Sequence, residues 1–306
     1  MNRVSTFGNY QSALLDLMTA QTRAQDAQER VSTQKVATDL SGFGRSSETL
    51  TALKSSQSRI QGFIDTGETV AARLSTQDLA LDRVAEGVSG AREAIAAALA
   101  SGRTDGLMLE LQGHYQITQD GLNGRHQNRY LFAGSQSATA PVTAMTMADL
   151  ADLPAASDAF ANDSLKQVSR LDEGTLMETG LLASEIGEEG FDIFRDIQLF
   201  HEATPINGGL DDATRDFLTA QLTRLDQARE TVTNFGARNG SLQNRVDSIL
   251  KAQTTQKVSL DEMLSKKTDA DLAQALTDLE LSQVAIQASA QVINQLRQVS
   301  LLNFLS

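Results

Sequence analysis

Two long stretches of the sequence place apolar residues seven apart, and this spacing constrains the fold more than any other feature. Heptad spacing puts side chains on one stripe of an α-helix, so that neighbouring helices can interlock along it. A helix of about 45 residues would run roughly 70 Å and needs partners, because isolated helices are marginal in water. The first stretch carries Leu53, Ile60, Gly67, Leu74, Leu81, Val88 and Ile95, with Phe63, Val70, Val84, Ala91 and Ala98 as companions and Gln77 as the exception.

The C-terminal half repeats the pattern and predicts a partner helix. Its members are Leu218, Leu225, Val232, Val246 and Leu260 at one position and Ala228, Phe235, Leu242, Ile249 and Met263 at the other, interrupted by Asn239, Gln253 and Gln256. The phase breaks at "KKTDADL", where Thr268 or Asp269 is expected to cap a last helix. The last helix then has Leu272, Leu279, Ile286 and Ile293 at sevens, and the first helix of the chain mirrors it with Tyr10, Leu17, Ala24 and Val31.

The middle of the chain differs from both halves. All three prolines, Pro141, Pro154 and Pro205, lie there, and proline in a helix interior costs about 3 kcal/mol or more. Residues 165–187 alternate around a "DEG" turn and predict a short β-hairpin. The segment from 191 then returns to helix. From Asp149 to Asp196 the sequence has twelve acidic residues and only three basic ones. This excess of negative charge indicates a solvated acidic surface.

The composition excludes several classes of protein. A formal net charge of -13 argues against a nucleic-acid partner, because phosphate binding needs a positive face. There is no cysteine, and hence no disulfide or thiolate chemistry. No stretch approaches the roughly 18 apolar residues of a membrane span, and no apolar signal-peptide core follows the first residues. We therefore expect neither membrane insertion nor a cleaved signal peptide.

The candidate chemical motifs are weak. None of His114, His126 and His201 has a second ligand at metal-binding spacing. The "GFGRSS" segment at 42–47 lacks the lysine of a phosphate loop and is better explained as a connection between helices. The "EIGEE" segment at 185–189 is expected to be a charged, solvated turn, because no base or nucleophile converges with it. We predict no catalytic residue, no cofactor and no metal site.

Four segments in order resemble one family. "ERVSTQKVATDLSGFG" resembles the segment that follows the first helix of flagellins, and "NRYLFAGSQSATAPV" resembles a signature of the family's hook-filament junction branch, the hook-associated proteins. "FGARNGSLQNRVDSI" is similar to a helix start of that branch, and "VAIQASAQVINQLRQVSLLNFL" resembles the family's terminal helix. The chain is thus similar to flagellins at both ends.

The resemblance implies a shape in which the two chain ends pair as an inner rod and the middle points outward. The expected fold class is mainly α, an elongated antiparallel helical or coiled-coil rod formed by the N- and C-terminal arms, with a small β-containing outer insertion. The expected parts are an axial helix at 1–44, a long helical rod at 45–135 and 191–266, an acidic outer domain at 136–190, and a C-terminal axial helix at 267–306. The hinge to the outer domain would be formed by Tyr130, Leu131, Phe132 and Gly134, where the long helix would end.

The function that follows is a non-enzymatic structural subunit of the bacterial flagellum at the hook-filament junction. The alternatives are a filament flagellin and, more distantly, an intracellular coiled-coil scaffold. The expected partners are other copies of the chain, a neighbouring hook-associated protein, flagellin, and an export chaperone on the C-terminal helix; the location would be extracellular, reached through the flagellar type III export apparatus. The expected subunit interface comprises Leu14, Leu17, Val31, Leu272, Leu279, Ile286, Ile293, Leu296, Leu301, Leu302, Phe304 and Leu305.

Overall fold

The computed structural model describes the backbone of residues 2–305 and the side chains of residues 8–297. The chain divides into two compact units, residues 60–255 and residues 1–59 with 256–306. Two long helices, α2 (Ser47–Ser101) and α6 (Asp212–Thr268), contribute to both units. Helices make up most of the described chain. The predicted class, mainly α with long antiparallel helices and a small β part, is confirmed.

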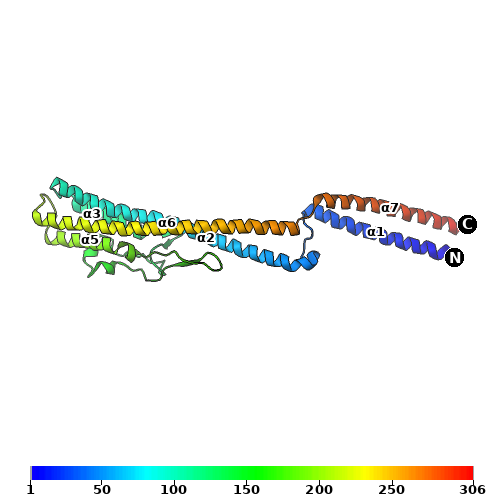
Figure 1. Cartoon of the computed structure of the whole chain (residues 1–306), viewed down its shortest axis with the longest axis horizontal. Helices are drawn as coiled ribbons and strands as arrows, with labels where there is room; N and C mark the ends of the chain where they lie inside the picture. The colour runs from blue at the N-terminus through cyan, green and yellow to red at the C-terminus, as the bar shows by residue number, and fades with distance from the viewer. Residues whose placement is uncertain (1, 306) are drawn as a thin grey trace. The chain divides into compact units, whose positions relative to one another are not determined.

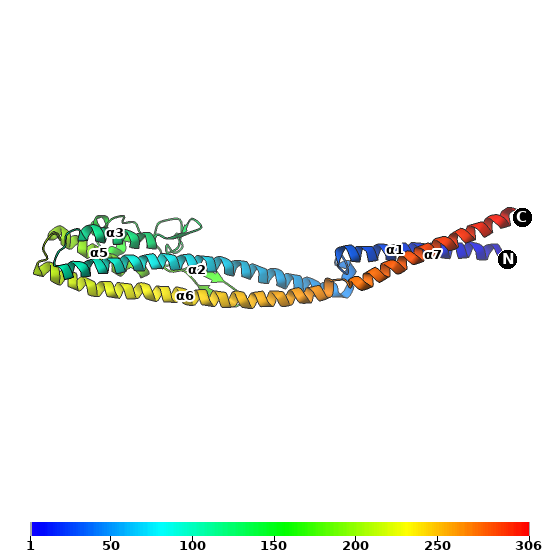
Figure 2. The same cartoon turned by 90° about the horizontal axis from the view of Figure 1, so that it is seen from above.

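In the unit formed by residues 60–255, α2 and α6 lie side by side and antiparallel (Figures 1 and 2). Arg92 Nε is 2.6 Å from Asp226 Oδ1, and Asn239 Nδ2 donates to the Leu74 carbonyl at 2.9 Å. The heptad residues of this unit face inward because the seven-residue spacing keeps one stripe against the partner. The buried ones include Leu74, Leu81, Val88 and Ile95 of α2 and Leu218, Leu225, Val232 and Val246 of α6.

The long N-terminal helix ends at Ser101, well before the "NRYLFAG" segment, so the expected helical rod over 45–135 is wrong in this respect. Gly102 (φ 68°) adopts the left-handed conformation that ends helices, and the Arg103 amide bonds back to the Ala98 carbonyl at 3.3 Å. A second left-handed glycine, Gly106, precedes α3 (Leu107–Leu122). The chain therefore turns and folds back instead of continuing.

The main core of this unit lies where α3 and α5 (Ala183–Ala203) pack beside α2 and α6. The Tyr115 ring lies 5.0 Å from Phe191 and 5.5 Å from Phe194, and all three side chains are fully buried. The "EIGEE" segment was expected to be a turn, but it is part of α5. Its Ile186 is buried in the same core, because helical spacing sends it inward while Glu188 stays exposed.

The segment between α3 and α5 is compact and mostly irregular. Two small antiparallel sheets form in it, β1 (Arg125–His126) with β2 (Arg129–Tyr130) and β3 (Val168–Arg170) with β4 (Leu176–Glu178). Between the two sheets lie α4 (Met147–Ala151) and the 3-10 turn η2 (Ala156–Ala159).

The β-hairpin expected around "DEG" is therefore present. Asp172 Oδ1 accepts hydrogen bonds from the Gly174 and Thr175 amides at 2.7 and 2.6 Å, a side-chain turn typical of aspartate. On either side of this turn, Leu171 and Met177 pack on Val70 and Leu74 in a second, smaller core.

The polar exceptions to the heptads have a structural reason. Three of the four are buried, and each donates its amide N–H to a backbone carbonyl: Asn239 to Leu74, Gln77 to Thr179 and Gln253 to Leu171. Thr179 follows β4 and Leu171 precedes the hairpin turn. Gln77 and Gln253 therefore fix the hairpin to the long helices, which leucine could not do.

The other unit contains α1 (Asn2–Thr33), the 3-10 turn η1 (Ser41–Ser46), α7 (Leu272–Leu305) and the adjoining ends of α2 and α6. The capping residue of α7 differs from the two expected. Asp271 Oδ1 accepts from the Ala273 and Gln274 amides at 3.0 and 3.2 Å, the pattern of an N-cap. Thr268 still belongs to α6, and Asp269 binds Lys35 instead.

Candidate assembly surface

The first and last helices, α1 and α7, lie side by side along their length (Figures 1 and 2). The centre of the contact on α1 is a row of alanines seven apart, Ala13, Ala20 and Ala27, all of them buried. Among the described side chains of α7, the most buried are Ala275, Ser282 and Ile293. Small residues let two helices approach closely, so this pair is held by a narrow seam.

The residues expected at the subunit interface fall into three groups. Ile293 is buried in the α1–α7 pair, and Leu17, Val31, Leu279, Ile286 and Leu296 are half-buried there. Leu14 and Leu272 are 36% and 40% exposed. The side chains of Leu301, Leu302, Phe304 and Leu305 lie outside the described residues. The structure thus brings most of the described set into one helix pair, and their role toward other subunits stays a prediction.

A second apolar surface on the pair was not anticipated from the heptads. Leu15 and Met18 of α1 are 65% and 62% exposed, and Leu281 and Val284 of α7 are 64% and 62% exposed. Val292, two turns beyond Val284, continues the row on α7. Exposed apolar rows of this kind mark interaction surfaces. The sequence does contain a signal for this row. Leu281, Val284 and Val292 lie outside the main heptad but share one face of a helix.

The connection between the arms is fixed by an ion pair. Lys35 Nζ lies 2.5 Å from Asp269 Oδ1, and the Val36 amide donates to the Thr268 carbonyl at 2.8 Å. Hydrogen bonds from Lys35 and Ser265 lower the pKa of Asp269 to about 2. A carboxyl whose pKa is lowered in the folded state stabilises above its ordinary value of 3.8 and loses that contribution as the pH falls toward 2. This link is therefore intact at neutral pH.

The expected hinge residues lie at the end of the β1–β2 hairpin, where the chain packs against the main core. Phe132 is fully buried in the main core, Leu131 packs partly against it, and Tyr130 closes the β1–β2 hairpin. Gly134 (φ 67°) takes the left-handed conformation beside Asp163. Nearby, the Asn123 side chain both donates to the carbonyl and accepts from the amide of buried Val142, at 3.1 and 2.9 Å. Their role as a hinge remains a prediction.

The histidines lie apart from one another and serve local contacts. His126 Nδ1 is 2.9 Å from Thr76 Oγ1, and His201 Nδ1 accepts from the Ile206 amide at 2.9 Å. His114 packs against Gly90 of α2. Within the described residues no cluster of three or more potential metal ligands occurs, and no described helix has the length and apolarity needed to cross a membrane.

Comparison with known proteins agrees with this geometry. Residues 222–305, which span most of α6 and all of α7, match the model of the bacterial flagellin C-terminal helical region. No curated protein matches the chain in sequence.

The fold is found in several solved structures, among them one from Vibrio parahaemolyticus and one from Bacillus cereus. A protein from Vibrio parahaemolyticus described as a flagellar hook-associated protein matches at a TM-score of 0.62 and 19% identity, over 76% of this chain and 99% of that one. Bacillus cereus FlgL matches at a TM-score of 0.53 and 16% identity, over 70% of this chain and 97% of that one.

The matched region is thus similar to the C-terminal helical region of bacterial flagellins, and the fold is similar to that of the two solved structures. Flagellins build an extracellular appendage and are structural, non-enzymatic proteins, so the matched region indicates a structural role in motility. The sequence match is confined to residues 222–305, and the two solved structures show a shared fold.

Proposed function

We propose that this chain is a structural subunit of the bacterial flagellum at the junction between hook and filament. The observation that carries the proposal is the shared fold with a protein described as hook-associated, over nearly all of that protein. The flagellin-type region at 222–305 supports the flagellum but is common to both branches of the family. The junction assignment depends on the fold match together with the "NRYLFAGSQSATAPV" resemblance.

The mechanism is assembly through paired terminal helices. The parts at 1–44 and 267–306 act as axial helices, and the α1–α7 pair presents its exposed apolar row to neighbouring subunits. Leu281, Val284 and Leu15 are well exposed in the single chain, so burying them against another copy contributes favourable free energy at about 25 cal/mol per Å2. The predicted interface residues whose side chains are described, from Leu14 to Leu296, would belong to this surface or to the seam below it.

The remaining partners follow from the same surface. One axial end would contact a hook-associated neighbour and the other would contact flagellin, while an export chaperone would cover the apolar row of α7 before assembly. The subunit would leave the cell through the flagellar type III export apparatus. The part at 136–190, which contains the β3–β4 hairpin, would face outward.

The alternative is a filament flagellin, because its terminal helices would look the same. The two differ in self-assembly. A junction subunit has unlike axial faces and stops, whereas matching heterologous faces propagate an open helix. An intracellular scaffold would not be found on sheared flagella at all.

The test is deletion of the gene together with assembly of the purified protein. We expect cells that have hooks but lose flagellin to the medium, restored by the wild-type gene, and purified protein that forms no long filaments alone. Long filaments from this chain alone, or normal filaments after its deletion, would move the assignment to flagellin. Absence of the protein from sheared wild-type flagella would contradict both.

A further inference from the structure

A cavity of about 580 Å3 lies within the unit formed by residues 60–255. Its lining comes from α2, from the β1–β2 hairpin with the residues after it, and from the backbone that flanks β3 and β4. Arg73, Arg129, Lys166 and His126 are part of that lining. No Asp or Glu is among the described residues that line it, although the chain as a whole carries a net charge of -13.

Arg73 is the most constrained of these groups. Its Nη2 donates to Thr179 Oγ1, and its Nε is buried with no hydrogen-bond partner in the described part of the chain. Burial lowers the pKa of the Arg73 guanidinium, because a low dielectric disfavours the charged form. A buried cation without a counter-charge is costly, and an anion in the cavity would offset that cost.

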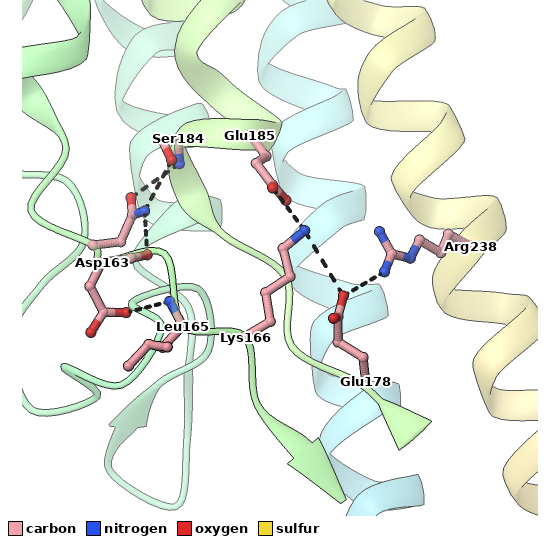
Figure 3. Close-up of polar contacts among 8 residues, drawn as sticks. Asp163, Leu165, Lys166, Glu178, Ser184, Glu185 and Arg238 are labelled. Carbon is pink, nitrogen blue, oxygen red and sulfur yellow. Dashed lines mark hydrogen bonds and ion pairs between the residues drawn. The ribbon is translucent and has the colours of Figure 1, made fainter. Parts of the chain in front are cut away.

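The second uncompensated cation is Arg129, which is exposed and forms no ion pair with any described residue. Lys166 differs from both, as Figure 3 shows: its Nζ is 2.8 Å from Glu185 and 4.0 Å from Glu178, and Glu178 also binds Arg238 at 3.0 Å. Another carboxylate, Asp163, lies beside the lining residue Gly134 and accepts hydrogen bonds from Ser135. Asp163 also accepts from the Leu165 amide at 3.0 Å (Figure 3). The positive charge left for a ligand is therefore that of the two arginines.

Other polar groups complete the lining. His126 Nε2 is buried without a hydrogen-bond partner among the described residues. The Tyr130 ring is held by Arg125, whose guanidinium lies 4.2 Å from the ring centre. Ser137 and Gln127 add a hydroxyl and an amide. These groups suit a body with several hydroxyls better than a bare ion, and the volume leaves room for one.

We propose that this cavity binds a small hydroxylated organic anion, a sugar acid or a sugar phosphate, whose carboxylate or phosphate contacts Arg73 and Arg129. The planar guanidinium fork matches both kinds of oxyanion with paired hydrogen bonds. The site goes beyond the proposed assembly role and does not depend on it.

Isothermal titration of the full-length protein tests the site with four probes: glucuronate, glucose 6-phosphate, inorganic phosphate and uncharged glucose. We expect saturable binding of glucuronate or glucose 6-phosphate, the stronger of the two identifying the oxyanion, and none of glucose. Arg73→Gln and Arg129→Gln should each weaken binding by about tenfold or more. Arg83→Gln, which removes an exposed arginine from the same helix, should leave it unchanged. Because Arg129 is exposed, its variant stays folded even if the Arg73 variant does not, and circular dichroism checks both.

Several outcomes would overturn the proposal. One is no saturable heat with any anion at millimolar concentration in the folded wild type. Equal losses in the Arg83 variant would show general charge attraction, and inorganic phosphate as the best ligand would exclude the hydroxylated body. Self-association that depends on Arg73, without binding of any small anion, would show that a carboxylate of a second copy fills the cavity.

Discussion

At the scale of single residues, polar side chains decide how the irregular segment attaches to the helices. Asn123, just after α3, satisfies both backbone groups of Val142, a residue with 1% exposure. Buried backbone groups are almost always paired, since an unpaired one costs the full loss of its hydration. Phe160 forms a β-bridge with Val142, and the Asn123 side chain pairs the amide and carbonyl of Val142 that this bridge leaves free.

Replacing Asn123 by alanine should therefore destabilise this unit by about 1–3 kcal/mol, because the amide and carbonyl of Val142 lose their partners. Urea unfolding followed by circular dichroism measures the effect. Asn234→Ala, at an exposed site on α6, is the matched control and should change the free energy of unfolding by less than about 0.5 kcal/mol. Equal effects of the two substitutions would show that the Asn123 bonds contribute nothing specific.

At the scale of elements, the α1–α7 pair combines a buried seam with an exposed apolar row. The seam is built from alanines on α1 and from Ala275, Ser282 and Ile293 on α7. Ile293 has the largest of these side chains, so it contributes much of the apolar contact in the seam. Ile293 is 9% exposed within the single chain. A change there affects the pair itself as well as any neighbour that docks on it.

Ile293→Asp should open the α1–α7 pair, since an unpaired carboxylate in an apolar seam costs several kcal/mol. Hydrogen exchange should rise in α1 and α7, assembly on flagella should fail, and the melting of residues 60–255 should be unchanged. Gln295→Asp adds the same charge at an exposed site of α7 and should affect none of these. A large drop in the melting temperature of the whole chain with Ile293→Asp would place this residue in the main core.

At the scale of the whole molecule, both hydrophobic cores fall inside residues 60–255. The other unit contains mainly the terminal helix pair and the connections held by Lys35 and Asp269. Stability is thus distributed unevenly, and the units should open at different free energies.

Residues 60–255 expressed alone should fold and melt cooperatively close to the main transition of the full chain, because they keep both cores. Mild proteolysis of the full chain should remove the two ends and leave a fragment of about residues 45–265, since exposed connections are cut first. Mass spectrometry of the fragments and thermal circular dichroism check this. First cuts inside residues 60–255, or a fragment that does not fold, would contradict it.

The sequence by itself determined the long antiparallel helices, the short hairpin and the apolar terminal stripes. Periodicity and turn residues are local properties of the chain, so the spacing of Leu74, Leu81 and Val88 or the "DEG" turn suffices to predict them. The polar breaks in the heptads were also visible, but not their purpose, because Gln77 and Gln253 bind carbonyls 102 and 82 residues away.

Only the tertiary structure decided where the chain folds back, which stripe of α1 is buried, and where unpaired cations meet. The reversal at Gly102 depends on a backbone conformation, and the burial of Ala13, Ala20 and Ala27 depends on how closely α7 approaches. The cavity joins Arg73 of α2 to Arg129 of a hairpin that packs on it. Residues so far apart in sequence come together only through packing, and no local pattern encodes that.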